Sequence, residues 1–562
     1  MKHVMVWVAK RLHKYIPAMA TMTLVHMGQA LLGVGFALGT RRVIDSAVSG
    51  DGDAFFRAGL IQCGIIAGVL LCQLLYRHLH EQLTAQLDRD WKRSILRDLL
   101  NSEFSEVSRF HSGELLNRMN NDVRILNRGL LDALPNVAAL LTRLVAAMAV
   151  LAAMEPWFAM VICAAGVAVI LATGLLRRNM KKLHKAVSEQ EGRVSGFLQE
   201  TLEKLMMVQA MDAGDEMECR GEALLAERYA AQRKRKNMSL LSNTCVSLLS
   251  HGAGFAALLW CGTKLLHGQL SFGSLTAVTQ LVNQIQMPVM NLSAVIPQYV
   301  AMIAAAERLK ELRDLKPEPE PLERTREELY RSMRSIRAEK LCFSYDRDVL
   351  MDQVSLELPK GSFVVITGTS GIGKSTLLKL LMGFCKPSAG RLYLELDGET
   401  VDAGRAVRRL FAYVPQGNLL LSGTLRENLT IAKPDASEAE IRQALYVSAM
   451  DEYLPQLPDG LQTLLGESGA GLSEGQAQRL AIARAILGGA PILLLDECTS
   501  ALDMETEQKV LQRIRELPNR TCVAVTHRPA AIALCDLHLE VAQGHISVRK
   551  TENGTRTHRG TV

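Results

Sequence analysis

A glycine-rich stretch at residues 368–376 has the residue types needed to hold phosphate groups. It reads Gly-Thr-Ser-Gly-Ile-Gly-Lys-Ser-Thr and fits the pattern G-x-x-x-x-G-K-[ST]. The β-branched run 363–366 precedes it and the leucine-rich run 377–382 follows it, as expected for a strand, a loop and a helix. In that context the backbone N–H groups of the loop surround phosphate oxygens, and the helix start adds partial positive charge. The alternative is a chance glycine-rich turn, and the flanking strand and helix argue against it.

Within this loop we expect Lys374 to reach the β- and γ-phosphates of a nucleotide and the Ser375 hydroxyl to bind Mg²⁺. The other nucleotide-binding positions predicted here are Gly368, Thr369, Ser370, Gly371, Ile372, Gly373 and Thr376.

A second segment with chemical potential is the apolar run 492–495, which is followed by Asp496 and Glu497. In a phosphate-hydrolysing site the first carboxylate supports Mg²⁺, and the second orients or deprotonates the attacking water. The alternative is an ordinary buried strand with solvated acids at its end. Its position well downstream of the glycine-rich loop favours the catalytic interpretation.

The apolar residues are concentrated in the first half of this 562-residue chain, which is 48% hydrophobic but only 5% aromatic. Each of six apolar runs is long enough to cross about 30 Å of hydrocarbon as a helix. These runs are residues 16–38, 54–75, 133–154, 157–176, 240–263 and 275–303.

The net charge of +6 is too small to argue for nucleic acid, and we expect no nucleic-acid partner. The basic residues before the first run resemble a signal peptide, but that run is too long, so we interpret it as a retained span.

The orientation of the spans follows from the basic residues near their ends. Arginines and lysines gather in 77–128 and 177–236, whereas the opposite connections carry few of them. Both termini and both long loops are therefore expected in the cytosol, with the loops forming helical extensions of the spans.

The eleven cysteines form no C-x-x-C pair, so neither a zinc site nor a disulfide framework is indicated. Prolines at 317, 319 and 321 end the sixth helix. We expect a transmembrane domain at 1–315, a linker at 316–335 and a nucleotide-binding domain at 336–562.

The run Gly-Leu-Ser-Glu-Gly-Gln at 471–476 closely resembles the LSGGQ signature of ABC ATPases. Together with the glycine-rich loop and the strand ending at Asp496 and Glu497, it makes the second half similar to an ABC nucleotide-binding domain. Five further motifs of that family are present in order. They are the adenine-stacking Tyr345, the Q-loop Gln416, an X-loop at 466–469, a D-loop with Asp503 and the switch His527. Each has an ordinary interpretation when taken alone, and their shared order supports the functional one.

The resemblance implies specific roles. Glu497, His527 and Gln416 are the expected catalytic residues, and Ser375, Gln416 and Asp496 the expected Mg²⁺ ligands, so the implied cofactors are ATP and Mg²⁺. The signature residues Ser473, Gly475 and Gln476 are expected to meet the γ-phosphate of ATP held by a partner domain. Glu474 replaces the usual glycine, a change that is tolerated if its side chain points away but that could slow hydrolysis.

Six spans followed by one such domain resemble an ABC exporter half-transporter. The fold class expected is an α-helical transmembrane domain (six spans, ABC exporter fold) followed by an α/β P-loop ABC nucleotide-binding domain. Residues 110–123 and 199–210 look like the two coupling regions of that family. Residues 268–275 look like the turn that leads into span six. Six spans are half a pathway, so a second half-transporter is needed, most simply in a homodimer, with a heterodimer as the alternative. A multi-pass protein of the bacterial inner (plasma) membrane is expected, with export favoured over import. No peptidase domain precedes the first span, so leader-cleaving peptide export is not indicated.

The substrate is the least defined part. Gln280, Asn283, Gln284, Met287 and Asn291 recur at helical spacing along span six and either line a cavity or form hydrogen bonds between helices. Arg143, in the middle of span three, either attracts an anionic group or pairs with a headgroup or a carbonyl. His26 in span one and His251 in span five are further cavity candidates, with a structural role as the alternative for each. We expect a small amphiphilic substrate (lipid, drug or peptide) and contact with membrane lipid; a regulatory role without pumping is the alternative.

Overall fold

The computed structural model describes residues 2–345, 348–417, 420–466 and 471–551; within these, the side chains of 2, 168–179, 181, 246, 250 and 289–296 lie outside the description. The chain forms two compact units. The helical unit comprises Met1–Asp98 and His111–Asp314, and the sheet unit comprises Leu99–Phe110 and Leu315–Val562.

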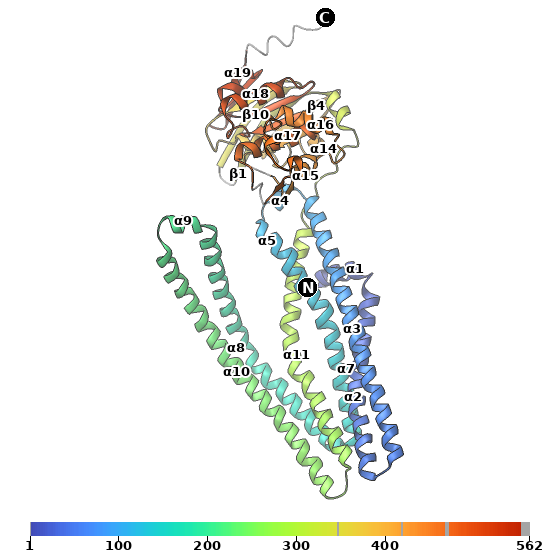
Figure 1. The fold of residues 1–562 in the computed structure, drawn as a ribbon. Helices are drawn as coiled ribbons and strands as arrows, with labels where there is room; N and C mark the ends of the chain where they lie inside the picture. The colour runs from blue at the N-terminus through green and yellow to red at the C-terminus, as the bar shows by residue number, and fades with distance from the viewer. Residues whose placement is uncertain (1, 346–347, 418–419, 467–470, 552–562) are drawn as a thin grey trace. The chain divides into compact units, whose positions relative to one another are not determined.

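Long helices make up the helical unit (Figure 1). In chain order the helices are α1 (Lys2–Leu12), α2 (Ile16–Ser49), α3 (Gly52–Leu100), α5 (Ser112–Asn117), α6 (Val123–Arg128), α7 (Leu134–Met154), α8 (Pro156–Glu203), α9 (Leu205–Ala210), α10 (Gly214–Leu266) and α11 (Phe272–Arg313). Two π-helical turns, η1 (Arg118–Asp122) and η2 (Gly129–Ala133), join α5, α6 and α7 into one continuous run.

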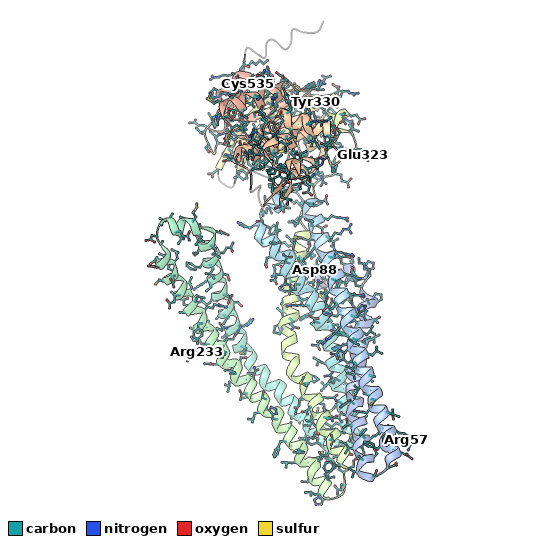
Figure 2. All side chains as sticks on the ribbon, viewed as in Figure 1. Arg57, Asp88, Arg233, Glu323, Tyr330 and Cys535 are labelled. Carbon is teal, nitrogen blue, oxygen red and sulfur yellow. The ribbon has the colours of Figure 1, made fainter. Side chains whose placement is uncertain are left out.

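Four of the helices in the described part of the chain are long and apolar enough to cross a membrane: Ile16–Ser49, Gly52–Leu100, Ser112–Met154 and Gly214–Leu266. Figure 2 shows Arg57 near the start of α3 and Asp88 well along the same helix. The other two predicted spans, 157–176 and 275–303, fall within α8 and α11, where part of the side chains lies outside the description. The number six therefore stays a prediction.

A buried apolar cluster holds α2, α7, α8, α10 and α11 together at one end of the helical unit, with Leu151, Phe158, Ala257 and Leu281 among its members. Beside it, the buried carboxylate of Glu155 accepts hydrogen bonds from Lys264 Nζ at 2.6 Å and Trp260 Nε1 at 3.2 Å. The helices α8 and α10 run side by side from this end as a hairpin, and α9 joins them at its tip (Figure 1).

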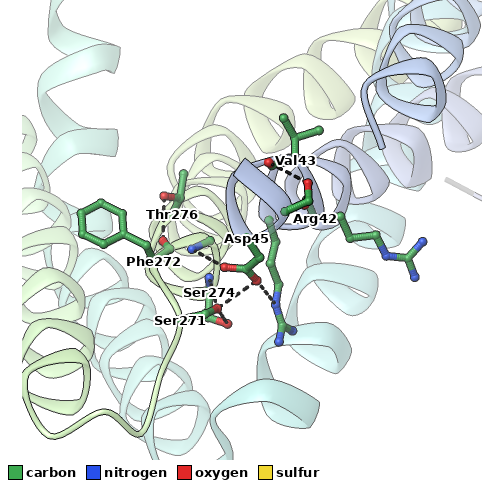
Figure 3. Close-up of polar contacts among 10 residues, drawn as sticks. Arg42, Val43, Asp45, Ser271, Phe272, Ser274 and Thr276 are labelled. Atoms are coloured by element: carbon green, nitrogen blue, oxygen red, sulfur yellow. Dashed lines mark hydrogen bonds and ion pairs between the residues drawn. The ribbon is translucent and has the colours of Figure 1, made fainter. Parts of the chain in front are cut away.

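The start of α11 is tied to the end of α2 by one carboxylate, as Figure 3 shows. Asp45 accepts hydrogen bonds from Ser271 Oγ and from the backbone N–H of Gly273, both at 2.9 Å, and pairs with Arg41 Nε at 3.5 Å. A Cβ on Gly273 would lie 2.3 Å from the carbonyl oxygen of Arg41. The two helices can approach this closely because residue 273 has no side chain.

The sheet unit contains two larger sheets. One is antiparallel, in the order β2-β1-β4-β5, and the other has the order β12-β11-β3-β10-β9-β6, with all neighbours parallel except β11 and β12. The strands are β1 (Met333–Tyr345), β2 (Asp348–Pro359), β3 (Phe363–Thr367), β4 (Ala389–Leu396), β5 (Glu399–Asp402), β6 (Phe411–Val414), β9 (Ile492–Asp496), β10 (Thr521–Val525), β11 (Leu537–Ala542) and β12 (His545–Lys550). Two short strands, β7 (Gly423–Thr424) and β8 (Leu464–Leu465), form a separate pair.

Alternation along the buried parallel strands divides the core in two. Val364 and Ile366 of β3 belong to one apolar cluster, and Phe363 and Val365 belong to the other. Continuous apolar strands of this kind are typical of a parallel sheet covered on both faces. The covering helices are α12 (Arg326–Ser332), α13 (Lys374–Leu381), α14 (Arg405–Arg408), α15 (Leu425–Thr430), α16 (Glu438–Val447), α17 (Glu474–Leu487), α18 (Met504–Arg515) and α19 (Pro529–Leu534).

The segment Leu99–Phe110, with the short helix α4 (Phe104–Val107), belongs to the sheet unit although it lies between α3 and α5 in sequence. Glu103 pairs with Lys386 at 2.6 Å, and the rings of Phe104 and Phe384 lie 5.2 Å apart. The coupling region was expected at 110–123, and the residues that pack on the sheet unit come just before it.

The predicted order of the two folds is confirmed: a helical unit with helices long and apolar enough to cross a membrane precedes a unit built of sheets and helices.

Candidate nucleotide-binding site

Four neighbouring parallel strands bring the predicted catalytic segments to one edge of the sheet. Their order is β3, β10, β9 and β6, and the last residues of each are paired in register. The glycine-rich loop follows β3, His527 follows β10, Glu497 follows β9 and Gln416 follows β6. Ligands of open α/β sheets bind at this carboxyl edge.

The glycine-rich loop leads from β3 into α13. Gly368 has φ +149°, and a Cβ there would lie 2.5 Å from the carbonyl oxygen of Val541, so only glycine fits. Thr369, Ser370 and Gly371 are exposed on the rim of the loop, and Ile372 is half-buried beneath it. Gly373, with φ +105°, caps the start of α13 and turns its first N–H groups toward the loop.

The ammonium group of Lys374 is buried at the centre of the site. It donates to the carbonyl oxygens of Gly368 at 2.7 Å and Thr369 at 3.1 Å, and it lies 3.2 Å from His527 Nε2 and 3.9 Å from Glu497 Oε1. A buried cation whose hydrogen bonds go to loop carbonyl oxygens is suited to exchange them for phosphate oxygens.

The carboxylate of Asp496 is 1% exposed and uses both oxygens. Oδ1 accepts a hydrogen bond from Ser375 Oγ and Oδ2 one from Tyr413 Oη, each at 2.9 Å. A hydroxyl and a carboxylate held together at a helix start are the hard oxygen ligands that Mg²⁺ prefers, with phosphate and water completing the shell. These residues fit the predicted role of Ser375 and Asp496 toward Mg²⁺.

Glu497 has the left-handed φ of +49°, which is uncommon for a residue with a side chain. Its backbone N–H donates to the carbonyl oxygen of Val525 at 2.9 Å, and its Oε2 accepts a hydrogen bond from Gln416 Nε2 at 2.9 Å. Gln416 and Lys374 therefore hold the Glu497 carboxylate from two sides. The structure brings together the predicted residues Lys374, Ser375, Gln416, Asp496, Glu497 and His527.

Tyr345, the predicted adenine platform, ends β1 and is 47% exposed as a residue. It contacts the edge of Phe343, and its hydroxyl lies 3.4 Å from Cys385 Sγ. Partial burial, followed by that contact, raises the pKa of Tyr345 to about 12.

The signature residues lie at the start of α17. Ser473 accepts a hydrogen bond from the N–H of Gln476, and the Gln476 side chain accepts one from the N–H of Ser473 at 2.8 Å, which is a capping box. Gly475 lies against the backbone of Ala501. Glu474 is exposed in the first turn of the helix. The X-loop with Glu467 lies outside the described residues.

Three residues that the sequence analysis did not single out organise this site. Tyr413 orients Asp496. Gln478, buried in α17, donates to Ser500 Oγ at 3.2 Å and accepts from the N–H of Ala501. Arg528 donates to the carbonyl oxygen of Ser500 at 2.6 Å. The D-loop is thus tied both to the signature helix and to the residue after His527. Their only sequence signal is position, since each lies within a few residues of a motif.

Asp503 of the D-loop caps α18 by accepting the N–H of Thr506 at 2.9 Å, and this bond holds the pKa of its carboxyl below the usual value. The predicted metal site has few protein ligands: among the described residues, no group of three His, Cys, Asp or Glu side chains is placed to hold an ion. That is consistent with Mg²⁺ bound largely through nucleotide phosphates.

Arg143 and the polar stripe of span six lie on two helices that pack together, α7 and α11, whereas His26 and His251 lie on α2 and α10. Gln284 donates to the carbonyl oxygen of Gly33 at 2.7 Å, the helix-to-helix bond that was one of the two interpretations. Asn283 and Met287 are exposed, Gln280 and Arg143 are half-buried, and the side chain of Asn291 lies outside the described residues. His26 stacks on Tyr76 with ring centroids 4.5 Å apart.

Comparison with known proteins agrees with this geometry. The family of ABC transporter transmembrane regions matches residues 19–289, and the ABC transporter family matches residues 351–500. An ATP-dependent lipid A-core flippase of Chromobacterium violaceum is 30% identical over 494 residues, or 86% of this chain and 83% of that protein. An ABC transporter ATP-binding protein of Bacillus subtilis, described as uncharacterized, is 29% identical over 83% of this chain and 81% of its own length.

Among solved structures, a bacterial Atm1-family ABC exporter with ATP bound has a TM-score of 0.79 and 24% identity. The alignment covers 98% of this chain and 97% of that one, which supports the same fold over both units.

Proposed function

Because the chain belongs to the ABC transporter family, we propose that it is one half of an exporter that works as a homodimer and moves an amphiphilic substrate across the membrane. The nucleotide-binding domain hydrolyses ATP, and this hydrolysis is coupled to transport. The observation that carries the finer proposal is the convergence of Lys374, Asp496, Glu497 and His527 at one sheet edge of a chain that also carries membrane-spanning helices.

In the proposed reaction Lys374 and the loop N–H groups hold the β- and γ-phosphates, and Tyr345 stacks on the adenine. Ser375, Asp496 and Gln416 are the residues placed to bind Mg²⁺, which neutralises phosphate charge when bound. Glu497 orients and deprotonates the attacking water, and His527 contacts the γ-phosphate beside Lys374. Ser473 and Gly475 complete the site of the partner chain, and Asp503 lies between the two sites.

Dimerisation is supported by the tip of the α8–α10 hairpin. Met206, Met207 and Met211 at this tip are 84%, 52% and 69% exposed. Flexible, exposed methionines on a helix are typical of a surface that packs on another protein. We propose that α9 packs on the nucleotide-binding domain of the partner chain, which would carry the ATP switch to the membrane helices. A heterodimer would use the same surface.

The proposed substrate is an amphiphile with an anionic group, exported from the cytosolic side of a bacterial inner membrane in which both termini face the cytosol. The relative named a lipid A-core flippase supports a lipid-like cargo. Arg143 on α7 is the proposed contact for its charge, and Asn283 and Met287 on α11 are proposed cavity residues. If Arg143→Ala leaves the transport of every anionic amphiphile tested unchanged, the anionic preference is wrong.

The first experiment is the ATPase activity of the purified chain in lipid, beside Glu497→Gln. Activity that this substitution abolishes supports a working homodimer, and stimulation by candidate amphiphiles then identifies the substrate. A folded chain that binds ATP without hydrolysing it would point to a partner chain or an obligatory substrate. Substrate-stimulated flux in sealed vesicles separates an exporter from a membrane ATPase that only regulates another protein.

A further inference from the structure

A basic pocket lies between the N-terminal segment and α3, within the helical unit, whereas the nucleotide site belongs to the sheet unit. Its volume is about 380 Å³, and four cationic residues line it: Arg11, Lys14, Arg93 and Arg97. The lining also includes one carboxylate, Asp90.

That carboxylate is already engaged by groups around it. Asp90 accepts hydrogen bonds from Lys14, from Tyr15 Oη at 2.7 Å and from Arg89 Nε at 3.3 Å. Its charge is therefore directed at Lys14 and Arg89. The pocket keeps a positive charge, because its four cationic residues outnumber Asp90 and the neighbouring Asp98 together.

The guanidinium of Arg11 is fixed in place. It lies over the ring of Trp91 at 5.4 Å, and Trp91 is buried at the base of the pocket. Burial, and then repulsion from Arg313, lowers the pKa of Arg11, with Asp98 acting in the opposite sense. An anion in the pocket would relieve this repulsion. Arginine matches phosphate with paired N–H donors, so a phosphate group suits this lining better than a simple halide.

The position of the pocket points to the source of such a phosphate. Val4, Val8 and Leu12 of α1 pack inward, while Val6 is 55% exposed, so α1 has apolar side chains on two faces. Lys14 comes two residues before Ile16, where α2 and the predicted first span begin. On the proposed topology this is the cytosolic headgroup layer, where basic pockets between helices bind anionic headgroups.

We propose that the pocket formed by Arg11, Lys14, Arg93 and Arg97 binds a phosphate-bearing anion at the depth of the lipid headgroups, separately from the ATP site and from the transported substrate. The site would hold α1 against α3 by joining cations from both segments around one phosphate.

The test is a thermal-unfolding titration of the full-length chain in detergent with short-chain phosphatidylglycerol, short-chain phosphatidylcholine and inorganic phosphate. Arg93→Gln removes an exposed cation of the lining. Lys92→Gln is the matched control, because Lys92 has the same charge, is the neighbouring residue of α3 and pairs with Asp88 outside the pocket. We expect Arg93→Gln to weaken phosphatidylglycerol binding about fivefold, the effect of losing one cation near an anionic headgroup.

The three probes distinguish the sources. Tighter binding of phosphatidylglycerol than of phosphatidylcholine, weakened by Arg93→Gln but not by Lys92→Gln, assigns the site to a lipid headgroup. The same variant pattern with inorganic phosphate assigns it to a soluble phosphate. The proposal is overturned if both variants bind phosphatidylglycerol as the parent chain does. Because this readout needs no ATP hydrolysis, its result is independent of the proposed export function.

Discussion

At the residue scale, the backbone of Glu497 shows how the sheet supports an unfavourable local conformation. A left-handed φ at a residue with a side chain costs on the order of 1 kcal/mol or more. Here the N–H of Glu497 donates to Val525 on the neighbouring strand, so sheet pairing stabilises the turn. The turn aims the carboxylate between Lys374 and Gln416, where an attacking water would need its base.

Tyr413→Phe tests whether Tyr413 positions the Mg²⁺ carboxylate. Burial, and then the charge of Asp496, raises the pKa of Tyr413, so its phenol stays protonated and donates throughout the working pH range. Losing a hydrogen bond to a buried carboxylate costs about 1.5–3 kcal/mol. We expect the Mg²⁺ concentration for half-maximal ATPase activity to rise roughly tenfold or more, with ATP binding in the absence of Mg²⁺ unchanged.

The matched control is Tyr453→Phe, a tyrosine of the same unit that packs on the edge of the core rather than at Asp496. An unchanged Mg²⁺ dependence in Tyr413→Phe would assign Tyr413 to packing alone.

Glu474→Gly tests the departure in the signature sequence. The side chain is exposed in the first turn of α17, where an acidic residue stabilises the helix by about 0.3–1 kcal/mol. The same charge would repel a γ-phosphate approaching that turn. We expect Glu474→Gly to leave ATPase activity similar or higher, measured beside the unfolding temperature of the isolated variant. A large loss of activity in a folded variant would mean that Glu474 has a positive role.

The residues of the site that lie inside sequence motifs could be predicted, because their spacing along the chain identifies them. Gln478 and Arg528 were missed because their role depends on contacts with the D-loop across the fold. The sequence shows that a glutamine is present in α17, but only the packed structure shows that it faces Ser500.

At the element scale, turns were predictable where the chain has a strong breaker, and less so where polar residues continue a helix. The third and fourth predicted spans leave only Glu155 and Pro156 between them, and α7 ends and α8 begins there. The first span was expected to stop at residue 38, yet α2 continues to Ser49. Hydropathy falls at Arg41 and Arg42, but these residues favour helix, and Asp45 gains partners from α11.

The stripe on α11 shows a further limit. Helical spacing places Gln280, Asn283 and Gln284 on related faces, but the neighbour of each depends on which helix packs there. Gln284 meets the Gly33 carbonyl on α2, while Asn283 remains exposed. The same stripe therefore contributes a contact between helices at Gln284 and an exposed side chain, available to line a cavity, at Asn283.

Gly273→Ala tests the junction of α2 and α11. The added methyl would lie 2.3 Å from a backbone oxygen, which cannot move as a side chain can. We expect a loss of about 1–3 kcal/mol in stability, measured as a lower thermal-unfolding temperature in detergent. Gly52→Ala, with no atom within 4 Å of its added Cβ, is the control and should change little. Equal unfolding temperatures for the two variants would mean that this junction is loosely packed.

At the scale of the whole molecule, a single chain contains every nucleotide motif but does not place its signature residues on its own phosphate loop. The side-chain hydrogen bonds of Ser473 and Gln476 are with each other's backbone, whereas Lys374 bonds the loop and His527. The exposed α9 tip likewise lacks a partner surface in its own hairpin. Both observations are accounted for by a second chain, which sequence motifs imply but a single chain cannot display.

A mixed dimer tests this arrangement directly. Lys374→Ala removes phosphate binding in the loop of one chain, and Ser473→Asp puts a carboxylate where the signature should meet phosphate while keeping the cap of α17. Each variant alone should lose at least about 100-fold in ATPase activity, since a key phosphate contact is missing from both sites. In a head-to-tail dimer of the two variants, both changes fall in one site. The other site combines the intact loop of the Ser473→Asp chain with the intact signature of the Lys374→Ala chain.

Co-expression with two different affinity tags should therefore yield mixed dimers whose activity exceeds that of either variant dimer. Mixed dimers with no more activity than the single variants would show that the two sites must act together or that the chains do not exchange signatures. A dimer carrying both substitutions in one chain and none in the other separates these outcomes. If the chains exchange signatures, each site then contains one change and the dimer should be inactive. If they do not, the unchanged chain keeps an intact site and the dimer should be active.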